Sequence, residues 1–366
     1  MTKVFFIINC YSKGGGAEAL LTSIVNNLNP QKYDLGIMEI IHEYIKEEPI
    51  KPYIKRYPYY TLADAPDRKA RMYYVYHEWN KVIEEYIPKD YDVYISFNYL
   101  KPSFLLPSNG KNIAWIHGDV YKLLADNKKE ERELQDIAFE KAKKIIVISD
   151  ITERSVKDLF PRHKNKITKL YNSIDCQRVV NASKEACNIK LAEKAVIVVG
   201  RLDDNKNPLR ALVIFEEVLK KVPDAILYFL GEGILENEIK QELYKKKIEN
   251  SVVLLGYYNN PYPIMKQAKV MLMTSKSEGY GLVIAESICL GVPVVSTRVG
   301  AAEREINSTK CGRVIDTDEE AVNAIVYYLG NAFDGASKAM ASSKLMHNFK
   351  KYIEVIENLI DETAKA

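Results

Sequence analysis

The chain has 366 residues, with 52 basic and 49 acidic side chains and a formal net charge of +3. Hydrophobic cores stop growing beyond about 250 to 300 residues, so this length favours two domains. Because basic and acidic residues nearly balance, the composition does not indicate a protein that binds polyanions such as nucleic acid. A local basic patch can still bind an anionic partner.

Short β-forming runs alternate with longer amphipathic stretches along most of the chain, a pattern typical of α/β units around parallel sheets. We predict a first set of strands at residues 3–9, 35–40, 93–96, 112–116 and 144–148. We predict a second set at residues 195–199, 225–230, 252–255, 270–273 and 293–296, with helices at 208–220 and 235–247. The expected domains are therefore 1–175 and 176–343, followed by an amphipathic helix at 344–366. The polar segment 176–194 has no strong strand signal and is a plausible linker.

The amino-terminal apolar run is too short for a signal peptide, and nowhere do 18 or more apolar residues run together. The five cysteines are scattered and lack C-x-x-C spacing, which predicts neither a disulfide framework nor a zinc site. We therefore expect a cytoplasmic chain that can still lie against a membrane.

A glycine-rich turn follows the first predicted strand. Residues 9–19 read NCYSKGGGAEA, and successive glycines allow positive φ and close backbone approach. The helix start after them offers free amides to an anion. The segment is neither G-x-G-x-x-G nor a Walker loop, and a glycine-rich turn without a ligand stays an alternative.

Two cations lie close together after the first strand of the second set. Residues 199–210 read VGRLDDNKNPLR, with Arg201 and Lys206 five residues apart. Arginine grips phosphate through paired hydrogen bonds, lysine adds a compact charge, and the helix beginning near Pro208 adds its amide-rich end. Together they suit a departing diphosphate. The alternative is a surface loop whose cations are solvated or paired with Asp203 and Asp204.

Two glutamates, Glu278 and Glu286, are separated by seven residues in the segment 274–297, TSKSEGYGLVIAESICLGVPVVST. The pattern predicts a turn at 275–281 and a helix at 282–290. Glu278 then lies just past the carboxyl end of a parallel strand and Glu286 on the second turn of the next helix, where a hydroxyl-rich ligand can meet both. The alternative is a pair of solvated glutamates.

This glutamate pair, with S-E-G-Y-G and G-V-P-V-V-S-T around it and R-x4-K upstream, resembles the motif of the retaining glycosyltransferases of the family 4 type. The resemblance covers nearly the whole chain, most sharply its second half. It implies an α/β GT-B fold: two Rossmann-like domains facing across a cleft, with the terminal helix crossing back to the first domain. It also implies transfer of a sugar, with retention, from a nucleotide diphosphate donor, most commonly UDP-linked, to a hydroxyl.

The resemblance implies roles for single residues. Glu278 orients the donor sugar, Glu286 binds the ribose, and Arg201 and Lys206 stabilise the leaving diphosphate. His117 follows the strand at 112–116 and matches a family histidine that contacts the donor sugar; a histidine that caps the strand is the alternative. The predicted catalytic residues are His117, Arg201, Lys206 and Glu278. The predicted donor-binding residues are Gly15, Gly16, Gly200, Arg201, Lys206, Gly231, Tyr257, Glu278, Gly279, Tyr280, Gly281, Leu282 and Glu286.

Three of these assignments depend on weaker likenesses to the family. G-G-A-E at 15–18 resembles its first-domain loop, L-G-E-G at 230–233 resembles its G-x-G turn, and Tyr257 follows the third strand, where the family places the nucleotide base. N-S-I-D at 172–175 departs from the family's N-G-I-D or N-P-I-D at its second position. These segments are expected to shape the site without defining it.

No metal or cofactor is expected. The chain has no D-x-D in a strand-end context, and Asp203 and Asp204 lie beside two cations, where they make a poor metal cage. In the family, side-chain cations take the place of a metal. No side chain is an evident covalent nucleophile, so the resemblance implies front-face attack guided by the leaving phosphate.

The segment 51–76 holds six basic residues, two acidic residues and seven tyrosines. Tyrosine with basic residues suits the interface of an anionic membrane. We expect docking beside a lipid-linked or glycan acceptor, on the inner face of a bacterial membrane, in cell-envelope or polysaccharide synthesis. A solvated helix and loop with tyrosines packed beneath is the alternative.

Two other functions fit the fold. A nucleotide-sugar epimerase needs acid-base carboxylates across the cleft, and the glutamate pair with R-x4-K fits transfer better. A catalytically silent subunit that binds a partner or glycan has no chemical reason to keep Glu278, Arg201 and Lys206. A nucleotide-binding measurement separates the silent subunit from the enzymes.

Overall fold

The computed structural model describes residues 1–12, 15–42, 49–58, 61–62, 66–124, 129–331 and 333–366. It divides the chain into two compact units, Met1–Asn172 with Phe349–Ala366 and Ser173–Asn348. The divisions fall at 172/173 and 348/349, whereas 175/176 and 343/344 were expected from the sequence.

The described residues of the first unit form a parallel sheet of seven strands in the order β4-β2-β1-β6-β7-β8-β9. All five strands predicted for this half are confirmed. The strands of the sheet are β1 (Thr2–Ile8), β2 (Tyr33–Glu39), β4 (Lys55–Arg56), β6 (Val93–Phe97), β7 (Lys111–Ile116), β8 (Ala142–Val147) and β9 (Ile167–Lys169). The additional strands β4 and β9 were not predicted, because runs this short leave little pattern in the sequence. A separate pair joins β3 (Ile41–His42) to β5 (Thr61–Leu62).

Helices flank this sheet, whose central strands are apolar on both faces because both are covered. The helices are α1 (Gly16–Val25), α2 (Arg68–His77), α3 (Trp79–Tyr86), α4 (Lys101–Phe104), α5 (Val120–Leu123), α6 (Lys129–Lys141), α7 (Asp150–Leu159), the 3₁₀ helix η1 (Pro161–Lys166) and α16 (Phe349–Lys365). The carboxyl-terminal α16 contacts β1, β6 and β7 and buries Ile353, Ile356 and Ile360. Tyr33 Oη donates a hydrogen bond to Asp361 over 2.8 Å, which also links α16 to β2.

In the part of the second unit that the structure describes, six strands form a parallel sheet in the order β12-β11-β10-β13-β14-β15. This sheet includes all five predicted strands. The strands are β10 (Ala195–Val199), β11 (Ile226–Leu230), β12 (Val252–Gly256), β13 (Val270–Met273), β14 (Val294–Thr297) and β15 (Gly312–Ile315). The helices are α8 (Cys176–Ala182), α9 (Pro208–Lys221), α10 (Glu236–Lys246), the 3₁₀ helix η2 (Glu249–Ser251), α11 (Tyr262–Met265), α12 (Leu282–Cys289), α13 (Ala302–Thr309), α14 (Asp318–Gly330) and α15 (Ala336–Met346).

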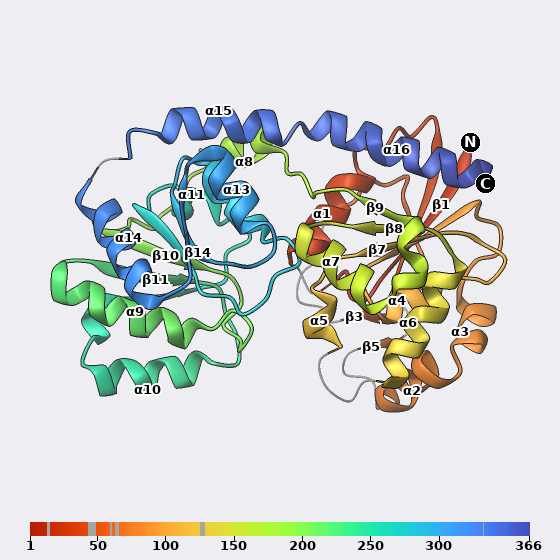
Figure 1. Cartoon of the computed structure of the whole chain (residues 1–366), viewed down its shortest axis with the longest axis horizontal. Coiled ribbons are helices and arrows are strands. Elements are labelled where there is room, and N and C mark those ends of the chain that lie inside the picture. Colours follow the sequence, from red (N-terminus) through yellow and green to blue (C-terminus); the bar gives the residue numbers. More distant parts are fainter. Residues whose placement is uncertain (13–14, 43–48, 59–60, 63–65, 125–128, 332) are drawn as a thin grey trace. The chain divides into compact units, whose positions relative to one another are not determined.

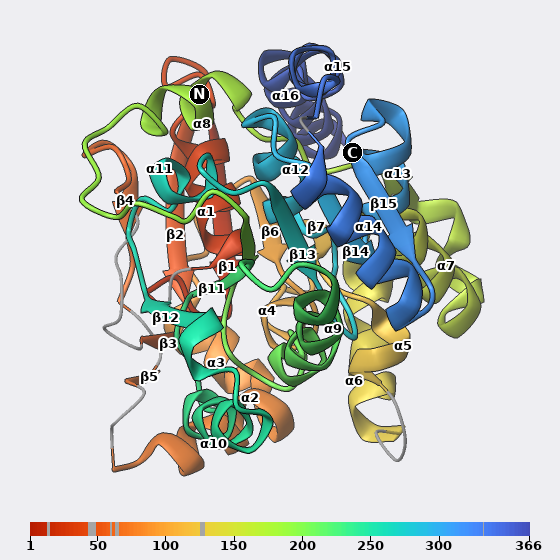
Figure 2. The ribbon, with the colours of Figure 1, turned by 90° about the vertical axis from the view of Figure 1, so that its left-hand side faces the viewer.

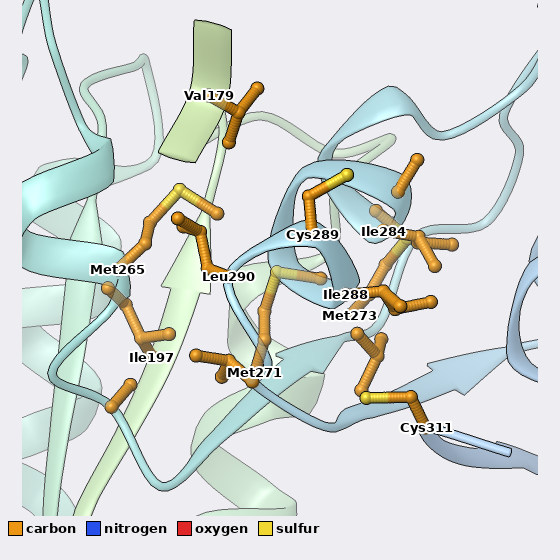
Figure 3. Packing of buried hydrophobic residues seen from close by; sticks show 14 of the residues in the cluster. Val179, Ile197, Met265, Met271, Met273, Ile284, Ile288, Cys289, Leu290 and Cys311 are labelled. Carbon is orange, nitrogen blue, oxygen red and sulfur yellow. The ribbon is translucent and has the colours of Figure 1, made fainter. Parts of the chain in front are cut away.

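Alternate side chains of this second sheet enter two hydrophobic clusters. Val270 and Leu272 pack with α9, α10 and α14, whereas Met271 and Met273 pack with α8, α11, α12, α13 and α15. Helices cover both faces of this sheet (Figures 1 and 2). Figure 3 shows the second cluster, in which the thioethers of Met271 and Met273 lie beside α12. Because both faces of the sheet are buried, β10 and β13 are held in place. The loops of the candidate site follow the ends of these two strands.

Two predictions about the segments flanking this unit are wrong. The expected linker 176–194 begins with α8, whose Val179 is buried in the core of the second unit. The expected helix at 344–366 is two helices, because α15 ends at Met346 and α16 begins at Phe349. Apolar periodicity continues across this break, which is why the sequence pattern did not reveal it.

The expectation of no disulfide is also corrected. Cys176, at the start of α8, is joined to Cys289, at the end of α12, with the sulfur atoms 2.11 Å apart. The two residues are separated by 113 positions, so their spacing along the chain carried no signal of the pairing. Cys10, Cys187 and Cys311 belong to no disulfide among the described residues.

Candidate functional site

The strand order of the second sheet reverses between β10 and β13. From β10 the chain continues to β11 and β12 on one side, while β13, β14 and β15 extend the sheet on the other. Ligands of open parallel sheets bind outside the carboxyl ends of the strands at such a reversal. Two loops leave the sheet there, 200–207 after β10 and 274–281 after β13.

Hydrogen bonds join these two loops directly. Asn205 Nδ2 donates to the Ser277 carbonyl over 2.9 Å, and the Lys276 amide donates to the Asn205 carbonyl over 2.7 Å. Thr274 Oγ1 donates to the Asn207 carbonyl over 2.9 Å. The loops are therefore held in one arrangement by contacts that sequence reasoning did not anticipate.

Lys206 and Glu278 form an ion pair across these loops. Lys206 Nζ lies 2.6 Å from Glu278 Oε1, and the two side chains are 22% and 13% exposed. Partial burial strengthens the attraction between these charges relative to the same pair in water. A lysine ammonium has three donors, so a ligand phosphate can bind beside Glu278. The structure thus brings together two of the residues that the sequence predicted as catalytic.

Arg201 lies on the same loop and is more exposed. Its Nε donates to Asp203 Oδ2 over 3.0 Å, and Asp203 Oδ1 accepts from the Lys206 amide over 2.9 Å. Asp204 instead pairs with Lys276. The sequence left open that the two cations pair with Asp203 and Asp204. The Arg201 side chain does pair with Asp203, whereas the Lys206 side chain pairs with Glu278.

Glu286 lies on α12 and accepts a hydrogen bond from Tyr262 Oη over 2.9 Å. Burial raises the pKa of the Glu286 carboxyl, and the Tyr262 hydrogen bond and the charge of Arg178 oppose that shift. Sequence reasoning missed Tyr262, because no motif connects it to a glutamate 24 positions away. A half-buried carboxylate with acceptor capacity left suits the hydroxyls of a sugar.

Glycines bring the ends of β10, β11 and β12 close together. Gly231 has φ +147°, and a Cβ there would lie 2.0 Å from the Gly200 carbonyl oxygen. The Gly231 amide donates to the Gly256 carbonyl over 2.9 Å. Tyr257 follows and is 47% exposed, and its amide donates to Glu232. Three of the predicted donor-binding residues, Gly200, Gly231 and Tyr257, thus lie along adjoining strand ends.

The turn that carries Glu278 continues through Gly279, Tyr280 and Gly281 to Leu282, the first residue of α12. Gly281 has φ +85° and precedes the helix as its N-cap. The Tyr280 side chain is only 3% exposed, and its hydroxyl donates to Glu305 over 2.5 Å. The Tyr280 side chain therefore points into the protein, away from the predicted donor contact.

The sheet of the first unit reverses its order between β1 and β6. The loop after β1 is fixed by Glu39, whose Oε2 accepts from the amides of Tyr11 and Ser12 over 2.7 and 2.9 Å. Gly15 and Gly16 begin α1, but neither has a positive φ, and Gly15 is extended. Residues 13–14 of the predicted glycine-rich loop lie outside the described residues.

His117 follows β7 in the first unit, with its ring centroid 4.1 Å from that of Phe97. The nearby Trp115 ring stacks on it at 5.7 Å. His117 Nε2 is buried and has no hydrogen-bond partner among the described residues. Burial lowers the pKa of His117 to about 3, so the ring is a neutral imidazole near neutral pH.

The lowered pKa predicts how His117 affects acid stability. Its stabilising contribution is fully present above about pH 6.5 and is lost as pH falls through that range toward the folded pKa of about 3. Between these pH values the unfolding free energy of the wild type should fall as pH falls. In His117→Gln this slope should be smaller by up to roughly 1.4 kcal/mol per pH unit. Denaturant titrations at several pH values measure the slope. His77→Gln, which replaces a more exposed histidine, is the control; equal slopes for both variants would contradict the assignment.

The predicted membrane-facing segment 51–76 includes β4, β5 and all of α2 except its last residue. Tyr53, Tyr73 and Tyr74 are 42%, 55% and 40% exposed. Tyr57 is half-buried and hydrogen-bonded to Tyr91. Residues 59–60 and 63–65 lie outside the described residues. The described tyrosines thus divide between an exposed set and a packed set.

Among the described residues, no group of three or more histidine, cysteine, aspartate or glutamate side chains is arranged to hold a metal ion. Arg201 and Lys206 place positive charge on the loop after β10.

Residues 180–354, which contain both loops of the site, match the family model described as Glycosyl transferases group 1. This segment is therefore similar to a group 1 glycosyltransferase domain. The chain is 31% identical over 182 residues to the N-acetylgalactosamine-N,N'-diacetylbacillosaminyl-diphospho-undecaprenol 4-alpha-N-acetylgalactosaminyltransferase of Campylobacter jejuni. That match covers 50% of this chain and 46% of the relative, so the chain spans about half the length of this curated relative.

Solved glycosyltransferase structures share the fold of this chain. Anabaena Alr3699/HepE in complex with UDP has a TM-score of 0.72 at 16% identity, covering 99% of this chain and 100% of the other. Sucrose-phosphate synthase of Thermosynechococcus elongatus has a TM-score of 0.80 at 14% identity, covering 98% of each chain. The fold is therefore that of the GT-B glycosyltransferases, with two parallel-sheet α/β units.

Proposed function

We propose that this protein is a retaining glycosyltransferase of the family 4 type. It transfers the sugar of a UDP-sugar donor to a hydroxyl of a glycan or lipid-linked acceptor. The observation that carries the proposal is the Lys206–Glu278 ion pair at the reversal point of a group 1 glycosyltransferase domain. The UDP in the Anabaena structure supports the choice of nucleotide. The acceptor named for the Campylobacter relative is a sugar on diphospho-undecaprenol, which supports a lipid-linked or glycan acceptor.

The reaction breaks the bond between the anomeric carbon of the donor and its diphosphate oxygen. The acceptor hydroxyl oxygen forms the new bond on the same face of the sugar, and its proton passes to the departing phosphate. Arg201, Lys206 and the amino-terminal end of α9 stabilise the negative charge that develops on the diphosphate. Glu278 orients the sugar hydroxyls, and Glu286 holds the ribose.

We propose that no metal takes part in turnover, because Arg201 and Lys206 supply the positive charge that a metal would supply. Transfer measured by release of UDP should be unchanged after treatment with EDTA. Loss of all activity, with recovery on adding Mg²⁺ or Mn²⁺, would overturn this part of the proposal. Absence of transfer under every condition, with intact nucleotide binding, would instead favour a silent subunit.

The proposed setting is the cytoplasmic face of a bacterial membrane during synthesis of the cell envelope or a polysaccharide. None of the helices formed by the described residues is long and apolar enough to cross a bilayer. Docking through the segment 51–76 is supported by the exposed Tyr53, Tyr73 and Tyr74 and by the basic residues around them.

Liposome flotation tests this docking. Vesicles that contain anionic phospholipid should carry the protein at low salt, and added salt should release it because the attraction is electrostatic. Neutral vesicles are the matched control. Equal recovery with neutral and anionic vesicles, or no binding at low salt, would exclude electrostatic docking.

A further inference from the structure

We infer that Glu305 is a positioning residue for the donor site, which it holds in place through Tyr280. This inference rests on the proposed function, because it assigns a second layer of side chains beneath the turn that carries Glu278. Glu305 lies on α13, and neither the glutamate motif nor the R-x4-K pair includes it.

Glu305 is fully buried and accepts hydrogen bonds from three side chains. Its Oε1 accepts from Tyr280 Oη over 2.5 Å and from Arg304 Nη1 over 3.0 Å. Its Oε2 lies 2.9 Å from His347 Nε2. Arg304 also donates to Tyr280 Oη over 3.1 Å. A buried carboxylate is tolerated only with such partners, and Arg304 supplies the opposite charge.

Tyr280 connects this cluster to the turn that holds Glu278. Its side chain reaches down to Glu305, while its carbonyl accepts from the Ala301 amide over 2.8 Å. Tyr280 is two residues from Glu278 and immediately precedes Gly281, the N-cap of α12. The turn is therefore tied at both the side chain and the backbone of one residue.

Close packing leaves the turn little freedom to move against α13. Gly300 has φ +53°, and a Cβ there would lie 2.5 Å from the Tyr280 carbonyl oxygen and 3.1 Å from Glu278 Cβ. The Cβ of Glu278 thus lies directly against the segment that leads into α13. Movement of Glu305 would be transmitted to the carboxylate that pairs with Lys206.

His347 closes the cluster from the other side. It follows α15, in the short segment before α16, and its side chain is 1% exposed. Its amide donates to the Ser343 carbonyl over 2.8 Å. Glu305 thereby joins the donor turn to the last residues of the second unit.

A buried ion cluster that serves only folding is the competing explanation, and matched variants separate the two. Tyr280→Phe removes a single hydroxyl and keeps the ring in place. Glu305→Gln keeps the shape of the side chain and removes its charge. Glu303→Gln makes the same change on the same helix at an exposed side chain, which pairs with Arg298.

The measurements are UDP affinity by calorimetry and hydrogen exchange of the amides of residues 275–281 without nucleotide. Tyr280→Phe and Glu305→Gln should each weaken UDP binding by roughly 5- to 10-fold, the size expected for one lost hydrogen bond, and should speed exchange in this turn. Glu303→Gln should match the wild type in both. A double-mutant cycle should be non-additive, because the two side chains contact each other.

Unchanged exchange in the turn of folded Tyr280→Phe and Glu305→Gln would overturn the inference, whatever the nucleotide result. If Glu305→Gln does not fold, Tyr280→Phe alone decides between the two explanations. Faster exchange in the turn with no UDP binding by the wild-type protein would instead count against the proposed function while supporting the positioning contact.

Discussion

Replacing Lys206 with methionine is expected to lower kcat for sugar transfer by about 1,000-fold, the loss typical when one group that stabilises a developing negative charge is removed. Methionine keeps most of the length and the apolar stem of lysine. The change removes the ammonium that lies 2.6 Å from Glu278 and is the more buried cation of the site. It also leaves Glu278 without this partner, so part of the effect should appear as altered donor KM.

Lys276→Met is the matched control for this prediction. Lys276 is two residues from Glu278, but its ammonium pairs with Asp204 and is 47% exposed. Its loss should change kcat by no more than about 3-fold, since exposed ion pairs contribute less than roughly 1 kcal/mol. Similar losses in both variants would show that overall charge, rather than the position of Lys206, determines the rate.

Glu286→Gln is expected to weaken UDP binding by about 10- to 100-fold, because an amide replaces a carboxylate that accepts hydrogen bonds from the ribose hydroxyls. The side chain keeps its size and its contact with Tyr262, so the fold should be retained. Isothermal titration of the wild type and the variant measures the change. Glu303→Gln is again the control. If the wild type and both variants bind UDP with equal affinity, Glu286 does not contact the nucleotide.

The raised pKa of Glu286 gives this prediction a pH dependence. Its carboxyl is protonated at a higher pH than usual because it is buried, and the raised pKa contributes stability that is lost as pH rises through the folded pKa. Ribose hydroxyls donate to the ionised form, so UDP affinity should rise as pH increases through that pKa and then level off. Glu286→Gln should lack this rise. If UDP affinity of the Glu286→Gln variant rises by the same amount, the rise comes from titration of the UDP phosphates and not from Glu286.

The strands were predictable because each is a short apolar run buried on both faces of a parallel sheet. The ten predicted strands occur, and Glu278 and Arg201 follow strands as expected. The short β4 and β9 were missed because edge strands of two and three residues have almost no pattern of their own. The pairing of Lys206 with Glu278 depends on strand order, which sequence runs alone do not specify.

The parts of the site that escaped prediction depend on contacts between distant residues. Tyr262, Glu305 and His347 belong to no motif and acquire their roles only when α11, α13 and the end of α15 pack together. Tyr280 was expected to contact the donor because of its place between Gly279 and Gly281. Its side chain instead turns inward, because a buried carboxylate lies beneath it.

The most direct test of the central claim is thermal unfolding of the purified protein with UDP, GDP, ADP and their common sugar conjugates. A ligand that binds only the folded state, at 100 times its Kd, adds about 2.7 kcal/mol, which gives a clear rise in Tm. The account predicts a rise with UDP and UDP-sugars that Glu286→Gln weakens. No rise with any nucleotide would contradict a donor site in this domain and would favour a silent subunit.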